Sequence, residues 1–354
     1  MSGKIFVAHD ALSGLLDDLS KKFKVWIPQM MDQASGHIAF GVYAPGKKPE
    51  LTRRSRLSPK KILFPSTDTL FKFTHVKDPK DPVRYTIDLK ESFDNGPTLV
   101  FGARPCDTRG FQTFDQVFLK GQYKDVYYER RRQNTLFATL VCQDSDTACF
   151  CSSVGSGPAD MTGSDMAVIP IEGGYVIEGL TDAGRKLVEA SGSAPSPEQA
   201  AEAEQIKQKT AAMKVGEDDL TGYADDLTRR FTDMDFWREQ VSPCITCGIC
   251  TWVCPTCYCF SITDEASGMS GERMRSWDSC MFYLYTLEAR GHNPRPTKME
   301  RYRNRVGHKF SYFPKKYDGM VSCCGCGRCI RTCPVSIDIR KVVKELKETA
   351  DDRA

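Results

Sequence analysis

The sequence predicts an α/β (α+β) N-terminal domain followed by an all-helical, cysteine-rich C-terminal domain. Three observations lead to this expectation. The chain has 354 residues, which is room for about two domains with ordinary cores. Strand-like apolar runs alternate with amphipathic helical runs in its first half, and cysteines concentrate in its last third. We place the first domain at 1–183, a helical connector at 184–224 and the second domain at 225–354.

Composition narrows the class of protein. The chain is 40% hydrophobic and 27% charged with a formal net charge of +3, as expected of a globular protein. No stretch approaches about 18 apolar residues and no signal peptide opens the chain, so we expect a cytoplasmic protein that meets no membrane. Sixteen cysteines against five histidines favour thiolate metal sites, because a reducing cytosol disfavours disulfides.

The N-terminal elements follow from hydrophobic spacing. Leucines at helical intervals after Asp10, a candidate N-cap, predict a helix, and Lys24–Ile27 predicts a strand that stops at Pro28. Further short strands are expected at Ile62–Phe64, Thr69–Thr74 and Arg84–Leu89. These segments are interpreted as structural.

The next segments predict a strand–helix–strand unit. The strand Thr98–Gly102 leads to a helix from Asp107 to Val117, a second helix spans 125–132, and the strand Thr135–Val141 follows. Sites in such units collect beyond the carboxyl ends of the strands. Four cysteines fall there or in the loop that follows: Cys106, Cys142, Cys149 and Cys151. These strand-end cysteines predict a third iron–sulfur cluster or a zinc site, and the alternative is reduced structural thiols.

A hairpin and a connector complete the first half. Met166–Ile171 and Tyr175–Gly179 flank a Gly-Gly turn and predict a β-hairpin. The stretch 184–215 is rich in Ala, Glu, Gln and Lys and predicts a solvated helical connector. A helix over 225–240 then leads into the first cysteine run.

Two cysteine runs are the strongest signal in the chain. The first run, Cys244–Cys254, and the second run, Cys323–Cys333, both fit C-x2-C-x2-C-x3-C followed by Pro. In this bacterial [4Fe–4S] pattern the fourth cysteine of each run ligates the cluster of the other. The spacing therefore predicts a ferredoxin-like domain with two [4Fe–4S] clusters, one held by Cys244, Cys247, Cys250 and Cys333, the other by Cys323, Cys326, Cys329 and Cys254.

The segment between the runs predicts helices, at 277–289 and 302–309. It also holds Cys257, Cys259 and Cys280, which we interpret chiefly as packing thiols. The alternatives are a further metal site, or replacement of Cys254 as a ligand by one of the three. Cys324 stands outside the register of the second run and is interpreted as a small buried hydrophobe.

Positive charge gathers in the same segment. From Arg273 to Lys316 there are eleven Lys or Arg against three acids. Guanidinium groups near a cluster offset its negative charge and raise its reduction potential. The alternatives are a docking surface for an acidic redox partner and a nucleic-acid surface, which the small net charge disfavours.

These motifs together resemble a known family. The chain is similar over nearly its whole length to the iron–sulfur subunit family that includes the A subunit of anaerobic sulfite reductase, the beta subunit of cytoplasmic sulfhydrogenase, and the iron–sulfur subunit of flavin oxidoreductases that feed heterodisulfide reductase. The resemblance is carried by Ala103–Asp107, Cys149–Cys151, Cys244–Cys259, Arg273–Cys280, Gly291–Pro296 and Cys323–Pro334.

The resemblance implies an electron-transfer subunit of an oxidoreductase complex, with no catalytic residues of its own. A flavin/NAD(P)H-binding subunit would supply electrons, and a hydrogenase, sulfite reductase or heterodisulfide reductase would receive them. Absence of a Walker loop, a Rossmann fingerprint or a Ser-His-Asp arrangement agrees with such a relay. The alternatives are a self-contained flavin-binding dehydrogenase and a metal-stabilised nucleic-acid-binding module.

Overall fold

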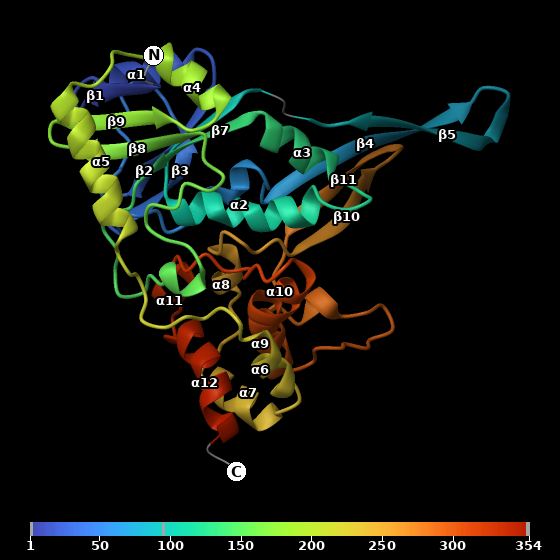
Figure 1. The fold of residues 1–354 in the computed structure, drawn as a ribbon. Helices are drawn as coiled ribbons and strands as arrows, with labels where there is room; N and C mark the ends of the chain where they lie inside the picture. Colours follow the sequence, from blue (N-terminus) through green and yellow to red (C-terminus); the bar gives the residue numbers. More distant parts are fainter. Residues whose placement is uncertain (1–2, 94–95, 352–354) are drawn as a thin grey trace.

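A computed structural model of the protein describes residues 3–93 and 96–351. Within these residues the chain forms a seven-stranded sheet ordered β1-β9-β8-β7-β6-β2-β3 and a four-stranded sheet ordered β10-β11-β4-β5. Helices cover the larger sheet, and most of the C-terminal helices gather below it (Figure 1).

The strands are β1 Lys4–Ala8, β2 Lys24–Asp32, β3 His37–Val42, β4 Thr67–Asp78, β5 Asp81–Glu91, β6 Thr98–Ala103, β7 Thr135–Leu140, β8 Met166–Ile171, β9 Gly174–Gly179, β10 Phe260–Ser267 and β11 Ser270–Trp277. The α-helices are α1 Leu12–Ser20, α2 Pro105–Phe118, α3 Val126–Gln133, α4 Asp182–Glu189, α5 Pro197–Ala211, α6 Ala224–Arg229, α7 Met234–Val241, α8 Ile249–Trp252, α9 Lys298–Gly307, α10 Phe313–Lys316, α11 Arg328–Arg331 and α12 Ile339–Asp351.

The larger sheet is mixed. Its central strands β2, β6, β7 and β8 run parallel, and β1, β3 and β9 pair antiparallel at its two sides. The buried leucines of α1 pack on one face, and three phenylalanines of α2 pack on the other. The parallel β6 and β7 therefore deliver their carboxyl ends to one edge, as the strand–helix–strand prediction requires.

Two N-terminal predictions are wrong in detail. Strand β2 continues through Pro28 to Asp32, because Pro28 lies opposite Phe40 of β3 while the parallel pairing with β6 has already ended at Trp26. The segment predicted as a strand at Ile62–Phe64 instead follows a short 3-10 helix, Pro59–Ile62. Its apolar side chains are buried because they pack under α2, not because they belong to a sheet.

The prediction of an all-helical C-terminal domain is also wrong. Strands β10 and β11 form a hairpin inside the C-terminal half, and β11 pairs antiparallel with β4. Buried Arg275 of β11 meets Asp68 and Asp125 from the N-terminal half, and this ion pairing fastens the hairpin to the other strands. The fold is therefore mixed α/β throughout, with one sheet built from both halves (Figure 1).

The predicted C-terminal helices are only partly right. The expected helix over 225–240 is divided into α6 and α7, and the region 277–289 holds only the short 3-10 helix Leu284–Thr286. The helix expected at 302–309 exists as α9, which continues into a π-helical turn at His308–Tyr312. Among the described residues, no helix combines the length and apolar character that a bilayer crossing requires.

Candidate iron–sulfur sites

Both cysteine runs adopt the same local backbone. Each has a left-handed glycine, Gly248 at φ 74° and Gly327 at φ 69°, followed by a four-residue helix, α8 or α11. Two residues earlier each run again takes a positive φ, at Thr246 and at Gly325. Glycine tolerates this conformation, whereas it is rare for a β-branched residue. The repeated geometry wraps the chain tightly enough for its thiols to face inward.

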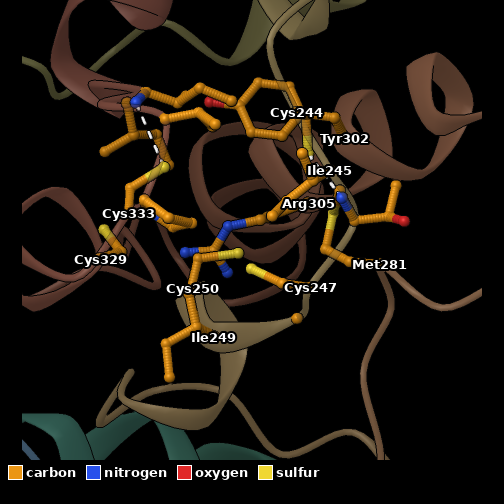
Figure 2. A pocket seen from close by; sticks show the side chains of 16 residues that line it. Cys244, Ile245, Cys247, Ile249, Cys250, Met281, Tyr302, Arg305, Cys329 and Cys333 are labelled. Carbon is orange, nitrogen blue, oxygen red and sulfur yellow. Dashed lines mark hydrogen bonds between the residues drawn. The ribbon is translucent and has the colours of Figure 1, made fainter.

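The first run and the end of the second line one cavity (Figure 2). Its wall contains Cys244, Cys247 and Cys250 together with Cys333, so the three thiols of one run meet the fourth cysteine of the other. Cys329 also reaches this wall. The structure thus brings together all four residues predicted for the first cluster.

Backbone amides point at two of these sulfurs. Thr246 N donates to Cys244 Sγ at 3.4 Å, and Ile337 N donates to Cys333 Sγ at 3.3 Å (Figure 2). Such hydrogen bonds stabilise thiolate charge and contribute to the reduction potential of a cluster. On the solvent side Cys247 is exposed, which brings this site to the molecular surface.

The second set of thiols lies deeper. Cys254 and Cys323 are buried, and burial raises the pKa of Cys323 to about 11, helped by the neighbouring Cys254. Burial also raises the pKa of Cys329, with further contributions from Cys254, Cys323 and Cys326. A hydrogen bond from Cys324 lowers the pKa of Cys326 to about 6. The four residues predicted for the second cluster are therefore mutual neighbours.

Two buried cations lie beside the thiols: Arg305 lines the cavity of the first set, and Lys309 contacts Cys254 of the second. Lys309 Nζ is 3.3 Å from Cys254 Sγ, and Arg305 Nη1 is 3.4 Å from Cys257 Sγ. Burial lowers the pKa of Lys309, but the thiols of Cys254 and Cys257 outweigh it, and the pKa is raised. Among the described residues neither cation has a carboxylate within ion-pair distance, and Arg305 Nη2 has no hydrogen-bond partner. A buried charge needs an opposite charge nearby, so these residues fit anionic iron–sulfur clusters.

The strand-end cysteines also collect in one place. Burial raises the pKa of Cys151 to about 12, with further contributions from Cys149 and Cys142. Burial also raises the pKa of Cys106, and Cys142 is among the nearby groups that contribute. Arg54 Nη1 donates to Cys149 Sγ at 2.8 Å. The group lies between the ends of β6 and β7 and the second run, because Phe150 N donates to Gly325 O at 2.8 Å.

Cys257, Cys259 and Cys280 line a different cavity, of about 540 Å³, together with Arg305 and Lys309. A hydrogen bond from Cys280 lowers the pKa of Cys259 to about 6. Another buried cation, Lys60, donates to Cys257 O at 3.1 Å. Their interpretation as packing thiols stays a prediction.

The described thiols are arranged differently from a single-ion site. In the part of the chain that the structure describes, no three Cys, His, Asp or Glu side chains are grouped so as to hold one metal ion. A zinc site needs such convergence, with Zn–S distances of about 2.3 Å. Ligands of a multi-iron cluster surround a larger core and do not meet at one point.

The basic segment Arg273–Lys316 is partly internal. Four of its cations are buried: Arg275, Arg301, Arg305 and Lys309. Arg301 donates to the carbonyls of Met281, Arg295 and Pro296. Because a nucleic-acid surface needs exposed cations, this burial disfavours that alternative. The individual roles of Arg305, Lys309, Lys60 and Arg54 were missed by sequence reasoning, and only the charge count of the segment signalled the first two.

The comparisons with known proteins agree with these sites. Residues 243–337 match the family model of the 4Fe-4S dicluster domain. Sulfhydrogenase 2 subunit beta of Pyrococcus furiosus is 32% identical over 302 residues, which cover 83% of this chain and 84% of that relative. No solved structure matches the chain. The resemblance seen in the sequence is confirmed: the chain belongs to the iron–sulfur protein family that includes the sulfhydrogenase beta subunit.

Proposed function

We propose that this chain is an electron-transfer subunit that relays single electrons through two [4Fe–4S] clusters within a cytoplasmic oxidoreductase complex. Its electrons would come from a flavin/NAD(P)H-binding subunit and pass to a terminal enzyme of the hydrogenase class. The relative named as a sulfhydrogenase beta subunit supports the choice of a hydrogenase over a sulfite reductase or heterodisulfide reductase.

One observation carries the proposal. The three thiols Cys244, Cys247 and Cys250 share a cavity wall with Cys333, the last cysteine of the other run. Such an exchange of the fourth ligand is the arrangement of proteins with two cubanes, and it keeps the two centres close. We assign the first cluster to these four residues. The second is assigned to Cys323, Cys326, Cys329 and Cys254.

The surrounding residues would tune and insulate the clusters. When bound, each cluster supplies one-electron redox chemistry. Lys309 and Arg305 hold buried positive charge beside the thiolates, which favours the more negative, reduced state. Thr246 N and Ile337 N donate to sulfur and act in the same direction. Exposed Cys247 gives the first centre a short approach to a partner.

The test is a crossed set of ligand substitutions. Iron, acid-labile sulfide and electron paramagnetic resonance spectra are measured for the anoxically purified chain and for Cys247→Ser, Cys333→Ser and Cys326→Ser. The proposal expects each variant to lose about four iron. It also expects Cys333→Ser to remove the same spectrum as Cys247→Ser, although Cys333 lies in the second run. If Cys333→Ser instead removed the spectrum that Cys326→Ser removes, the crossed assignment would be contradicted.

A second measurement tests the relay role. Affinity purification of the tagged chain from its native host should recover a flavin-containing subunit and a terminal oxidoreductase subunit. Recovery of a lone chain whose clusters do not reduce with dithionite would count against electron transfer. A flavin bound to the isolated chain would favour the self-contained dehydrogenase.

A further inference from the structure

We propose that the strand-end cysteines, Cys106, Cys142, Cys149 and Cys151, bind a third [4Fe–4S] cluster placed directly against the second run. This inference rests on the proposed relay and extends it by one centre. The family model that matches the chain covers 243–337 and so leaves these four residues unassigned.

The topology brings the four cysteines together. Cys106 lies in the first turn of α2, just after β6, and Cys142 lies just after β7, the parallel neighbour of β6. Parallel neighbours present their carboxyl ends at the same edge. The loop after β7 then carries Cys149 and Cys151, and it closes back on this edge, where Cys142 N donates to Pro158 O at 3.0 Å.

The loop that carries these thiols is docked on the second run. Phe150 N donates to Gly325 O, and a methyl group at Gly325 would lie 2.5 Å from the Cα of Cys151. A methyl group at Gly327 would lie 2.4 Å from Ala148 O. Only glycine permits this approach at both positions. The backbone of the cysteine loop therefore touches the backbone that carries Cys326.

Positive charge surrounds the outer thiol of the group. Arg54 Nη1 lies 2.8 Å from Cys149 Sγ, and Arg331 Nη1 lies 3.8 Å from it. Arg331 comes from the second run and also pairs with Asp146 at 2.7 Å. Two guanidinium groups aimed at one sulfur stabilise a thiolate. A four-thiol site that lies against a run of cluster ligands is placed to extend an electron path, whereas zinc has no redox chemistry to offer there.

The third centre would change the shape of the relay. Cys149 lines an open cavity of about 630 Å³ at the surface. The exposed Cys247 marks the first cluster. The buried second cluster would then stand between two centres that each reach the surface, so that electrons cross the chain from one partner to another.

The first test counts iron, sulfide and zinc per chain in the anoxically purified full-length protein. Wild type is expected to hold about four more iron than Cys142→Ser, and about twelve if the two runs and this site are the only iron sites. Thr139→Ser, a buried position of β7 three residues before Cys142, is the matched control and should lose none. Equal iron in wild type and Cys142→Ser, or about one zinc lost in place of iron, would overturn the inference. Iron missing from the two cysteine runs themselves would instead refute the relay.

A second variant keeps the test decisive if Cys142→Ser fails to fold. Arg54→Met leaves every thiol in place and removes the cation beside Cys149. A redox titration should show one centre shifted to a lower potential and the two others unchanged. Arg53→Met is the control, because Arg53 pairs with Glu50 at the surface. Identical titrations for Arg54→Met, Arg53→Met and wild type would overturn the inference.

Discussion

Replacing Asp107 by Asn should destabilise the junction between α2 and the second cysteine run. Asp107 Oδ1 lies 2.7 Å from Arg328 Nη1, and the two side chains are 1% and 3% exposed. The contact lacks hydrogen-bond geometry, so it acts by charge attraction. Asn keeps the size of the side chain and an oxygen that can accept from Arg104 N. The substitution therefore removes the charge and turns the amide NH2 of Asn toward Arg328 Nη1, where neither group can accept a hydrogen bond.

The expected loss follows from the burial of the pair. Breaking a buried ion pair by removing one partner costs about 3–5 kcal/mol, because the other charge stays buried without compensation. Arg328 retains hydrogen bonds to Ser55 O and Ser55 Oγ at 3.1 and 3.2 Å, which places the loss near the lower value, about 3 kcal/mol. For a chain of 354 residues that is a fall of about 4 °C in Tm.

The assay is anoxic thermal unfolding followed by circular dichroism, with iron content measured in parallel. Asp18→Asn is the matched control, because Asp18 pairs with Lys21 on the surface and solvent-exposed pairs contribute little to stability. The double variant Asp107→Leu/Arg328→Met should recover much of the loss, since apolar replacement of both partners is often neutral. A fall for Asp107→Asn no larger than for Asp18→Asn would refute the reasoning.

Three further predictions concern the cysteine runs. Gly325→Ala should lower Tm and iron content far more than Gly319→Ala, because both have a left-handed φ but only Gly325 meets neighbouring backbone, at 2.4 Å; equal effects in unfolding and iron assays would contradict this. Lys309→Met should lower the midpoint potential of one centre in a redox titration, whereas the surface variant Lys315→Met should not, and unchanged midpoints would argue against charge tuning. Thr246→Gly should raise the free energy of unfolding by less than about 1 kcal/mol. The strain of a β-branched residue at φ 57° is relieved, and this gain exceeds the entropy cost of glycine. A clear loss of stability in the same unfolding assay would show that Thr246 makes a needed contact.

The cysteine signal was readable from the sequence because ligand spacing is local. C-x2-C-x2-C-x3-C with a following Pro specifies how the backbone wraps, and the exchange of Cys254 and Cys333 follows from the pattern itself. The strand-end cysteines were predictable for a related reason. β6 and β7 are parallel neighbours, so Cys106 and Cys142 share an edge once the strands are placed.

The second sheet could be read only in part: the strands predicted at Thr69–Thr74 and Arg84–Leu89 are confirmed as β4 and β5, but the hairpin β10–β11 was missed. β10 and β11 are rich in charged and small residues, which predict solvated structure. They become strands because Arg275 pairs with Asp68 and Asp125 from distant segments. Trp277 also donates from Nε1 to Phe64 O at 3.0 Å. Such long-range contacts override local propensity, and no periodicity in the sequence reports them.

The burial of the cations could not be predicted from the sequence either. Eleven positive residues in Arg273–Lys316 suggested a charged surface as readily as an interior role. Only the fold shows that Arg305 and Lys309 turn inward, Arg305 into the wall of the first cavity and Lys309 beside Cys254. Their burial without carboxylate partners among the described residues is what links the charge of the segment to the clusters.

The measurement that tests the central claim most directly is an anoxic coulometric titration of the purified chain. The relay account predicts reversible uptake of at least about two electrons per chain, one for each cubane of the two runs, with recovery of the starting spectrum on reoxidation. Uptake of about one further electron that Cys142→Ser abolishes would add the third centre. A chain that holds its iron but takes up no electrons would contradict the account.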